Sequence, residues 1–149
     1  MVTQAPVGLK PRRFAISTDG SAVWLTAEVA GSVQLLGLIK GAVTDEVRFT
    51  PPNVRREDIR PVGIILSRDG SCAFVALSRA GVVAVVDTAA RRVAGYWPAG
   101  RPMDVVSAGG TLYVTDAQDD AVLALDAATG RVLRSAKLGR TPHTVLTDE

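Results

Sequence analysis

Cysteine and histidine are almost absent from this chain of 149 residues, which contains one of each. A single cysteine, Cys72, cannot form an internal disulfide, and its place in a predicted strand indicates a small buried side chain. A lone histidine, His143, cannot build a multi-histidine metal site, and no cysteine lies at ligand spacing from it. We therefore expect no metal site, no cofactor and no catalytic constellation, and we interpret the chain as a non-enzyme.

Long apolar runs and a strong excess of one charge are also missing. No apolar stretch approaches the roughly 20 residues that a membrane-spanning helix needs. The basic residues at 10, 12 and 13 are not followed by an apolar stretch, so this N-terminus does not resemble a signal peptide, and a chain that truly starts here is expected in the cytoplasm. The net charge is +2, and acidic residues are interspersed with basic ones, which favours a solvated surface over a nucleic-acid interface.

The residues that are present indicate a folded β protein. Hydrophobic residues make up 47% and charged residues 21% of the chain, a globular composition, and the length suits a single domain with its own core. The stretch 113–126 contains two short apolar runs, 113–115 and 121–125, with a polar turn between them. Strands favour β-branched and aromatic residues, and turns favour residues that tolerate tight backbone geometry, so this stretch predicts a β-hairpin.

Related stretches occur three times along the chain. Trp24, Phe74 and Tyr113 take one equivalent position, at which we expect them to pack one repeat against the next. Phe74 and Tyr113 are 39 residues apart, and so are Asp87 and Asp126. A fixed period near 40 residues with several short strands in each unit is typical of propeller blades.

Each unit divides into four predicted strands. The first strands (14–17, 62–67 and 103–107) end in Asp-Gly or Gly-Gly turns, which suit tight hairpins. The third strands are 32–36, 82–87 and 121–126, and the more polar fourth strands are 46–49, 92–97 and 132–138. We therefore predict an all-β fold in one domain, 1–149: a partial β-propeller of about three four-stranded blades (roughly 9–49, 59–98 and 100–139) plus the first strand of a fourth blade at 142–148. A β-sandwich has a similar strand count but would not explain why the units resemble one another.

The third unit also follows the order of a known repeat. Tyr113, Val114 and Thr115 are followed by an apolar strand that ends in Asp-Ala-Ala-Thr-Gly (126–130), and then by Gly-Arg-Thr-Pro (139–142). This order resembles the YVTN-type β-propeller repeat family, which runs Tyr-Val-Thr-Asn, an apolar strand ending in Asp-x-x-Thr-Gly, and Gly-x-x-Pro. The resemblance covers nearly the whole chain from Leu9 onward.

The segments 8–14 and 49–64 are similar to the C-terminal part of the PQQ-dependent catabolism-associated β-propeller proteins. This resemblance implies a periplasmic, seven-bladed, non-enzymatic protein linked to quinoprotein alcohol oxidation, with a periplasmic quinoprotein dehydrogenase as a candidate protein partner. The chain departs from that family in length. An arc of three blades leaves two apolar blade faces exposed, so we expect a fragment, a shortened gene product, or a homo-oligomer that completes the ring.

A basic residue precedes the proline that opens each unit. An insertion at 51–58 adds two arginines on the same expected face, and the histidine lies where the chain enters a channel-lining strand. The candidate binding residues are Lys10, Arg60, Arg101, Arg140, His143, Arg55 and Arg56. Arranged around an axis, they would form a partial ring of positive charge that binds an anionic small ligand or an acidic protein partner. The alternative is that they are solvated loop residues, some paired with Asp104, Glu57 or Asp58.

The resulting functional expectation is a non-catalytic binding or scaffold protein, placed by resemblance beside PQQ-dependent alcohol oxidation. The alternative is an enzyme or enzyme subunit of lactonase-like or quinoprotein propeller type. Such an enzyme would need metal ligands or a quinone site around its channel.

Overall fold

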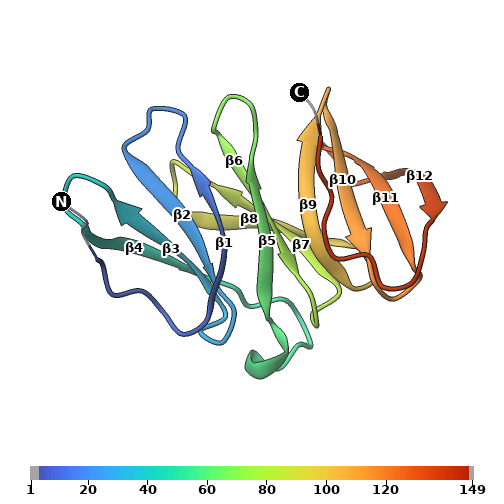
Figure 1. Ribbon diagram of the computed structural model, residues 1–149, viewed down its shortest axis with the longest axis horizontal. Helices are drawn as coiled ribbons and strands as arrows, with labels where there is room; N and C mark the ends of the chain where they lie inside the picture. Colours follow the sequence, from blue (N-terminus) through green and yellow to red (C-terminus); the bar gives the residue numbers. More distant parts are fainter. Residues whose placement is uncertain (1–3, 148–149) are drawn as a thin grey trace.

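Three antiparallel sheets of four strands each make up the fold in the computed structural model, which describes residues 4–147 (Figure 1). In each sheet the strands are adjacent in the order of the sequence, so every sheet is a meander. We call the sheets blades 1, 2 and 3. The strands are β1 (Pro11–Ile16), β2 (Ala22–Ala27), β3 (Ser32–Gly37) and β4 (Ala42–Arg48); β5 (Pro61–Leu66), β6 (Cys72–Leu77), β7 (Val82–Asp87) and β8 (Arg92–Pro98); and β9 (Pro102–Ala108), β10 (Thr111–Asp116), β11 (Ala121–Asp126) and β12 (Val132–Lys137). The predicted all-β architecture of three four-stranded blades is confirmed.

The turn between β1 and β2 shows how the local sequence produces a hairpin. Gly20 adopts a φ of 71°, a conformation that glycine enters without a steric penalty. The Asp19 carboxylate accepts hydrogen bonds from the Ser17 hydroxyl (2.6 Å) and from the Ser21 amide (2.9 Å). These donors lower the pKa of Asp19 to about 2. Blade 2 repeats the arrangement around Asp69, whose pKa is likewise lowered to about 2.

The first strands of the three blades lie next to one another along the inner edge of the arc. β5 lies between β1 and β9 and contacts both (Figure 1). The approach of β5 to β9 depends on Gly63, because a Cβ atom there would lie 2.8 Å from the Asp104 Cα. On the other side, the Thr26 hydroxyl of blade 1 donates to the Val62 carbonyl of blade 2 (3.0 Å). Backbone contacts as well as side chains therefore join the blades.

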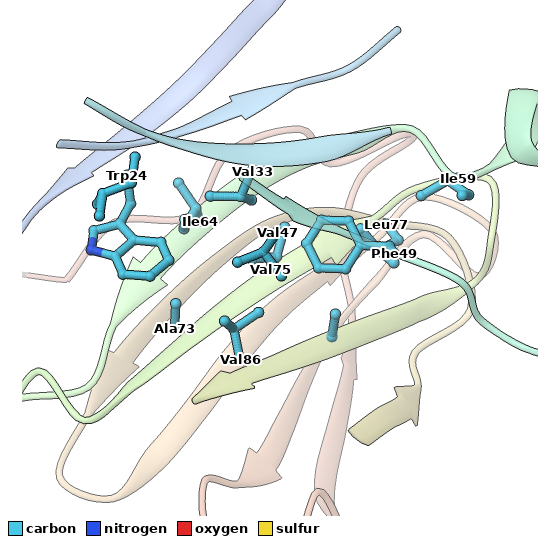
Figure 2. Close-up of a cluster of buried hydrophobic side chains, with 12 residues drawn as sticks. Trp24, Val33, Val47, Phe49, Ile59, Ile64, Ala73, Val75, Leu77 and Val86 are labelled. Atoms are coloured by element: carbon cyan, nitrogen blue, oxygen red, sulfur yellow. The ribbon is translucent and has the colours of Figure 1, made fainter. Parts of the chain in front are cut away.

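The core consists of two apolar layers, one between each pair of neighbouring blades. In the first layer, Trp24, Val33 and Val47 of blade 1 pack against Val75 and other residues of blade 2 (Figure 2). The second layer joins blade 2 to blade 3 through a further set of buried residues: Phe74, Val83, Val105, Leu112, Val114 and Leu125. The predicted packing role of Trp24 and Phe74 is thus confirmed. Tyr113, at the same repeat position, is only half-buried, because blade 3 is not followed by another blade among residues 4–147.

The end of the chain differs from the expected first strand of a fourth blade at 142–148. Residues 142–147 form no strand ladder, and residue 148 lies outside the described part. A ladder needs a neighbouring strand to accept its hydrogen bonds, and this segment pairs with no strand among residues 4–147. It is held instead by side chains, since the Val145 amide donates to the Asp104 carboxylate (3.4 Å) and Arg13 donates to the Thr144 hydroxyl (3.2 Å).

Two strands begin three or more residues earlier than expected. The strand expected at 14–17 begins three residues earlier, at Pro11, and the one expected at 46–49 begins at Ala42. Both added segments are polar or exposed, so their pairing follows from register with the neighbouring strand and not from hydrophobic pattern. No helix in residues 4–147 has the length and apolar character needed to cross a bilayer.

Candidate functional site

The basic residues that open the three blades occupy equivalent places in the backbone. In each blade the carbonyl of that residue accepts a hydrogen bond of 3.0 Å from the amide that follows the second strand: Lys10 from Glu28, Arg60 from Ser78, and Arg101 from Ala117. All three therefore lie at the end of the sheets where the inner strands begin. The insertion before β5, with its short 3₁₀ helix η1 (Arg56–Asp58), is at the same end (Figure 1).

Three cations surround the carboxylate of Glu28, whose side chain is only 14% exposed. The ion-pair distances to its oxygens are 3.1 Å from Lys10 Nζ, 3.2 Å from Arg12 Nε and 3.8 Å from Arg60 Nη1. One negative charge cannot neutralise three positive ones, so this cluster keeps a local positive excess. The structure thereby brings together two of the predicted residues, Lys10 and Arg60, and adds Arg12.

Ion pairs and a hydrogen bond of its own side chains hold the insertion in place. Arg55 binds the Asp58 carboxylate at 2.7 Å, and Arg79 approaches the same carboxylate at 3.6 Å. The hydrogen bond from Arg55 is the main reason that the pKa of Asp58 is lowered. Arg60 donates to the Glu57 carbonyl at 2.9 Å, which joins the insertion to the Glu28 cluster. The predicted pairing of some of these arginines with Glu57 or Asp58 is therefore present.

A hollow of about 290 Å³ lies beneath the insertion. Its apolar lining includes Phe49 and Ile59, which are buried, together with Val54. Arg48 and Arg56 bring positive charge to it. Arg48 is already paired with Glu46 (3.0 Å), whereas Arg56 forms no ion pair within residues 4–147. The hollow therefore combines an apolar lining with one cation, Arg56, that remains available to a ligand.

The predicted histidine lies elsewhere, on the concave side of the arc. His143 lines a hollow of about 330 Å³ with Arg12, Arg13 and Met103. Arg13 reaches the carboxylate of Asp104 at 3.5 Å. Burial raises the pKa of Asp104, although the Val105 amide and Arg13 act in the opposite direction.

The remaining predicted residues are not brought into either group. The backbone amide of Arg101 donates to Asp116 (2.8 Å), while its side chain is exposed, and Arg140 is exposed as well. Neither has an ion-pair partner in the described part of the chain. In the same residues, no group of three His, Cys, Asp or Glu side chains is placed to hold a metal ion.

Sequence reasoning missed Glu28, Arg12 and Arg13 as members of these groups. Aligning the repeats would have pointed to Glu28, because it takes the place of Ser78 and Ala117, opposite the basic residue that opens each blade. Arg12 and Arg13 lie on β1 directly after its first residue, where the inner strand starts.

No protein-family model and no curated protein matches this chain. Several solved structures do match this chain. Hydrazine synthase from Kuenenia stuttgartiensis matches with a TM-score of 0.75 and 22% identity, over 94% of this chain and 40% of that one. A putative 6-phosphogluconolactonase from Bacteroides fragilis matches with a TM-score of 0.75 and 21% identity, over 91% of this chain and 41% of that one. The periplasmic gluconolactonase PpgL from Pseudomonas aeruginosa matches with a TM-score of 0.71 and 24% identity, over 93% of this chain and 42% of that one.

The chain thus spans about two fifths of the length of the structures that it matches. Identities at this level carry information about fold and not about activity. The chain has the fold of part of a β-propeller.

Proposed function

We propose that this chain is a non-catalytic binding or scaffold module that recognises an anionic ligand or an acidic protein partner at the end where its inner strands begin. The residues that would carry this role form the basic edge: Lys10, Arg12, Arg55, Arg56, Arg60 and Arg79. The observation that supports the proposal is the charge of this edge. Five of its six cations pair with only three carboxylates, those of Glu28, Glu57 and Asp58, and Arg56 pairs with none in residues 4–147.

This local excess of three positive charges is larger than the net charge of the entire chain, +2. Within the basic edge itself, cations therefore outnumber carboxylates by three. A cluster of like charge attracts an oppositely charged partner and accelerates its encounter. Cations that share one carboxylate, as those around Glu28 do, can turn to a ligand while Glu28 keeps another partner.

For the partner, we propose a periplasmic quinoprotein dehydrogenase, and for the location, the periplasm. The support is the resemblance of segments 8–14 and 49–64 to the PQQ-dependent catabolism-associated β-propeller proteins. The second of these segments is the insertion that contributes Arg55 and Arg56 to the basic edge.

The test is the binding of purified chain to a purified quinoprotein dehydrogenase by surface plasmon resonance at about 50 and about 300 mM salt, because screening of charges strengthens over that range. We expect binding to weaken with salt, and the double variant R56Q/R60Q to weaken it about tenfold at low salt, which corresponds to about 1.4 kcal/mol. The matched control is Arg92→Gln, an exposed arginine at the start of the outer strand β8. An equal loss of affinity in the control variant, or binding that is insensitive to salt, would count against the proposal.

A second candidate is a lactonase-like enzyme, and one observation favours it. Asp104 is 7% exposed and has a raised pKa, and it is linked to the concave hollow through Arg13. A buried carboxyl group with a raised pKa is a common feature of general acids and bases. Two of the similar structures are described as lactonases. Hydrolysis of gluconolactone by the wild type, abolished in Asp104→Asn and His143→Ala, would favour this activity, whereas no turnover above the buffer rate would contradict it.

A further inference from the structure

The two blade interfaces inside this chain are built from equivalent positions. We call the face that a blade turns to the following blade its leading face. In blade 1 the leading face contains Trp24, Val33, Leu35 and Val47, and in blade 2 it contains Phe74, Val83, Val85 and Trp97. The strand register is the same in both, since Trp24 lies opposite Leu35 and Phe74 lies opposite Val85. Each set packs against the next blade.

Blade 3 presents the same leading face, which no other blade covers among residues 4–147. Its equivalent residues are Tyr113, Val122, Ala124 and Ala136, with Tyr113 opposite Ala124 and Val122 opposite Ala136. All four are apolar or aromatic, and they line an open hollow of about 410 Å³ together with Thr111, Leu133 and Arg134. The face that is buried on blades 1 and 2 is therefore exposed on blade 3.

The opposite, trailing face of blade 1 is not covered by another blade in the part of the chain that the structure describes. In blades 2 and 3 this face is formed by Ile64, Val75 and Val86, and by Val105, Val114 and Leu125. The equivalent residues of blade 1 are Phe14, Leu25 and Leu36. Phe14 is 63% exposed, and Ile16 beside it on β1 is 56% exposed. The segment that ends at Gly8 covers only part of this face, where the Gly8 amide donates to Gln34 (2.6 Å).

We propose that two copies of this chain associate head to tail, with the leading face of blade 3 in each copy packed on the trailing face of blade 1 in the other. Each contact would repeat the blade-to-blade packing that the chain already forms twice. Because each copy brings three blades, the two contacts close a twofold ring of six blades, within the range of roughly 4–8 that propellers use.

The sizes of the side chains support this pairing of faces. The leading face of blade 3 is smaller than its counterpart at two positions, because Ala124 and Ala136 stand where blade 1 has Leu35 and Val47. The trailing face of blade 1 is larger, because Phe14, Leu25 and Leu36 stand where blade 2 has Ile64, Val75 and Val86. A protein interface must be filled at the density of a core, so a small face suits a large one. These complementary faces favour a second copy as the occupant.

The test is the mass in solution, measured by sedimentation velocity over a range of concentrations. We expect twice the 15.6 kDa of one chain. Phe14→Lys places a charge on the trailing face and Ala124→Glu places one on the leading face, and each variant alone should be monomeric. The matched control is Ile39→Lys, at a side chain that is 96% exposed in the turn between β3 and β4, and it should remain dimeric.

A mixture of the two variants tests the head-to-tail geometry. In the mixed pair, one contact has two unaltered faces, and the other places the positive charge introduced by Phe14→Lys against the negative charge introduced by Ala124→Glu, so the dimer should return. A wild type that remains monomeric with an unchanged far-ultraviolet circular dichroism spectrum would overturn the proposal. So would a dimer that Ala124→Glu dissociates and Phe14→Lys does not, because that result indicates blade 3 packed on blade 3. If either variant loses its folded spectrum, Ile16→Lys and Tyr113→Glu replace the two, which keeps opposite charges on the two faces.

Discussion

Gly63 shows how one residue without a side chain sets the distance between two blades. It lies on β5, and a Cβ atom there would meet the Asp104 Cα at 2.8 Å and the Val105 amide nitrogen at 3.2 Å. Backbone atoms cannot rotate away as a side chain can, so a larger residue would push the inner strands apart.

Gly63→Ala is therefore expected to lower the free energy of unfolding by about 1–3 kcal/mol. The matched control is Gly95→Ala on β8, where a Cβ atom would find no atom within 4 Å beyond its chain neighbours. The control should change stability by less than about 1 kcal/mol. Urea unfolding followed by tryptophan fluorescence measures both, and equal losses in the two variants would contradict the assignment.

The turn carboxylates Asp19 and Asp69 make the stability of the fold depend on pH in the acidic range. Their pKa values in the folded chain, about 2, lie below the ordinary value of an aspartate, so the ionised form is favoured by folding. Their contribution to stability is complete at pH values above the ordinary pKa of an aspartate. It is lost as the pH falls from roughly 4 toward 2.

Asp69→Asn should consequently reduce the loss of stability over that pH window. An amide keeps an oxygen for the Ser71 amide and hydroxyl but does not titrate. The measurement is urea unfolding at several pH values between roughly 2 and 5, which bracket the titration of an aspartate, for the wild type and the variant. Parallel pH profiles for the two proteins would show that the Asp69 carboxylate does not contribute.

At the scale of the element, equivalent positions in the repeat differ in what covers them. Phe74 of blade 2 is buried and contacts Trp97 with ring centroids 5.7 Å apart. Tyr113 occupies the same position in blade 3 and borders an open hollow. The strands that carry the two residues have the same register with their neighbours. The difference in burial between the two side chains comes from the adjacent blade, which only Phe74 has, and from Trp97 on β8, where blade 3 has Ala136.

Phe74→Ala is expected to destabilise the chain by about 3–5 kcal/mol, because it leaves a cavity in the layer between blades 2 and 3. Tyr113→Ala should change the stability of the monomer by less than about 1 kcal/mol, since little apolar surface is buried there. Chemical unfolding at concentrations low enough to keep the chain monomeric compares the two. A large effect of Tyr113→Ala under those conditions would mean that blade 3 is covered within a single chain.

At the scale of the whole molecule, both ends of the arc carry apolar surface that the interior of the same arc buries. The trailing face of blade 1 contains Phe14 and Ile16, and the leading face of blade 3 contains Tyr113 and Val122. Covering such surface removes it from water and stabilises the folded state at roughly 25 cal/mol per Å². If two copies bind through these faces, folding and association are linked.

The thermal midpoint of the wild type should then rise with chain concentration, because a partner that binds only the folded state stabilises it, by about 2.7 kcal/mol at a hundredfold excess over the dissociation constant. Differential scanning calorimetry at several concentrations measures the shift. Ile39→Lys should retain the dependence and Phe14→Lys should lose it. A wild-type midpoint that is constant over this range would argue against linkage.

The sequence by itself determined the strands, the hairpins and the repeat. Asp-Gly turns and apolar runs act between residues that are close along the chain, so Ser17, Asp19 and Gly20 form in the structure the turn that their order predicts. The same local rules placed Lys10, Arg60 and Arg101 at equivalent positions.

Only the tertiary structure decided which of these positions are covered and which charges meet. Glu28 gathers Lys10, Arg12 and Arg60, and Arg13 reaches Asp104 in another blade, through contacts between residues far apart in the sequence. Residues 142–147, which the repeat predicts to be a strand, remain unpaired in the described chain because no neighbouring strand accepts their hydrogen bonds. Turn chemistry is local, whereas burial and charge pairing depend on neighbours that only the packing of the blades supplies.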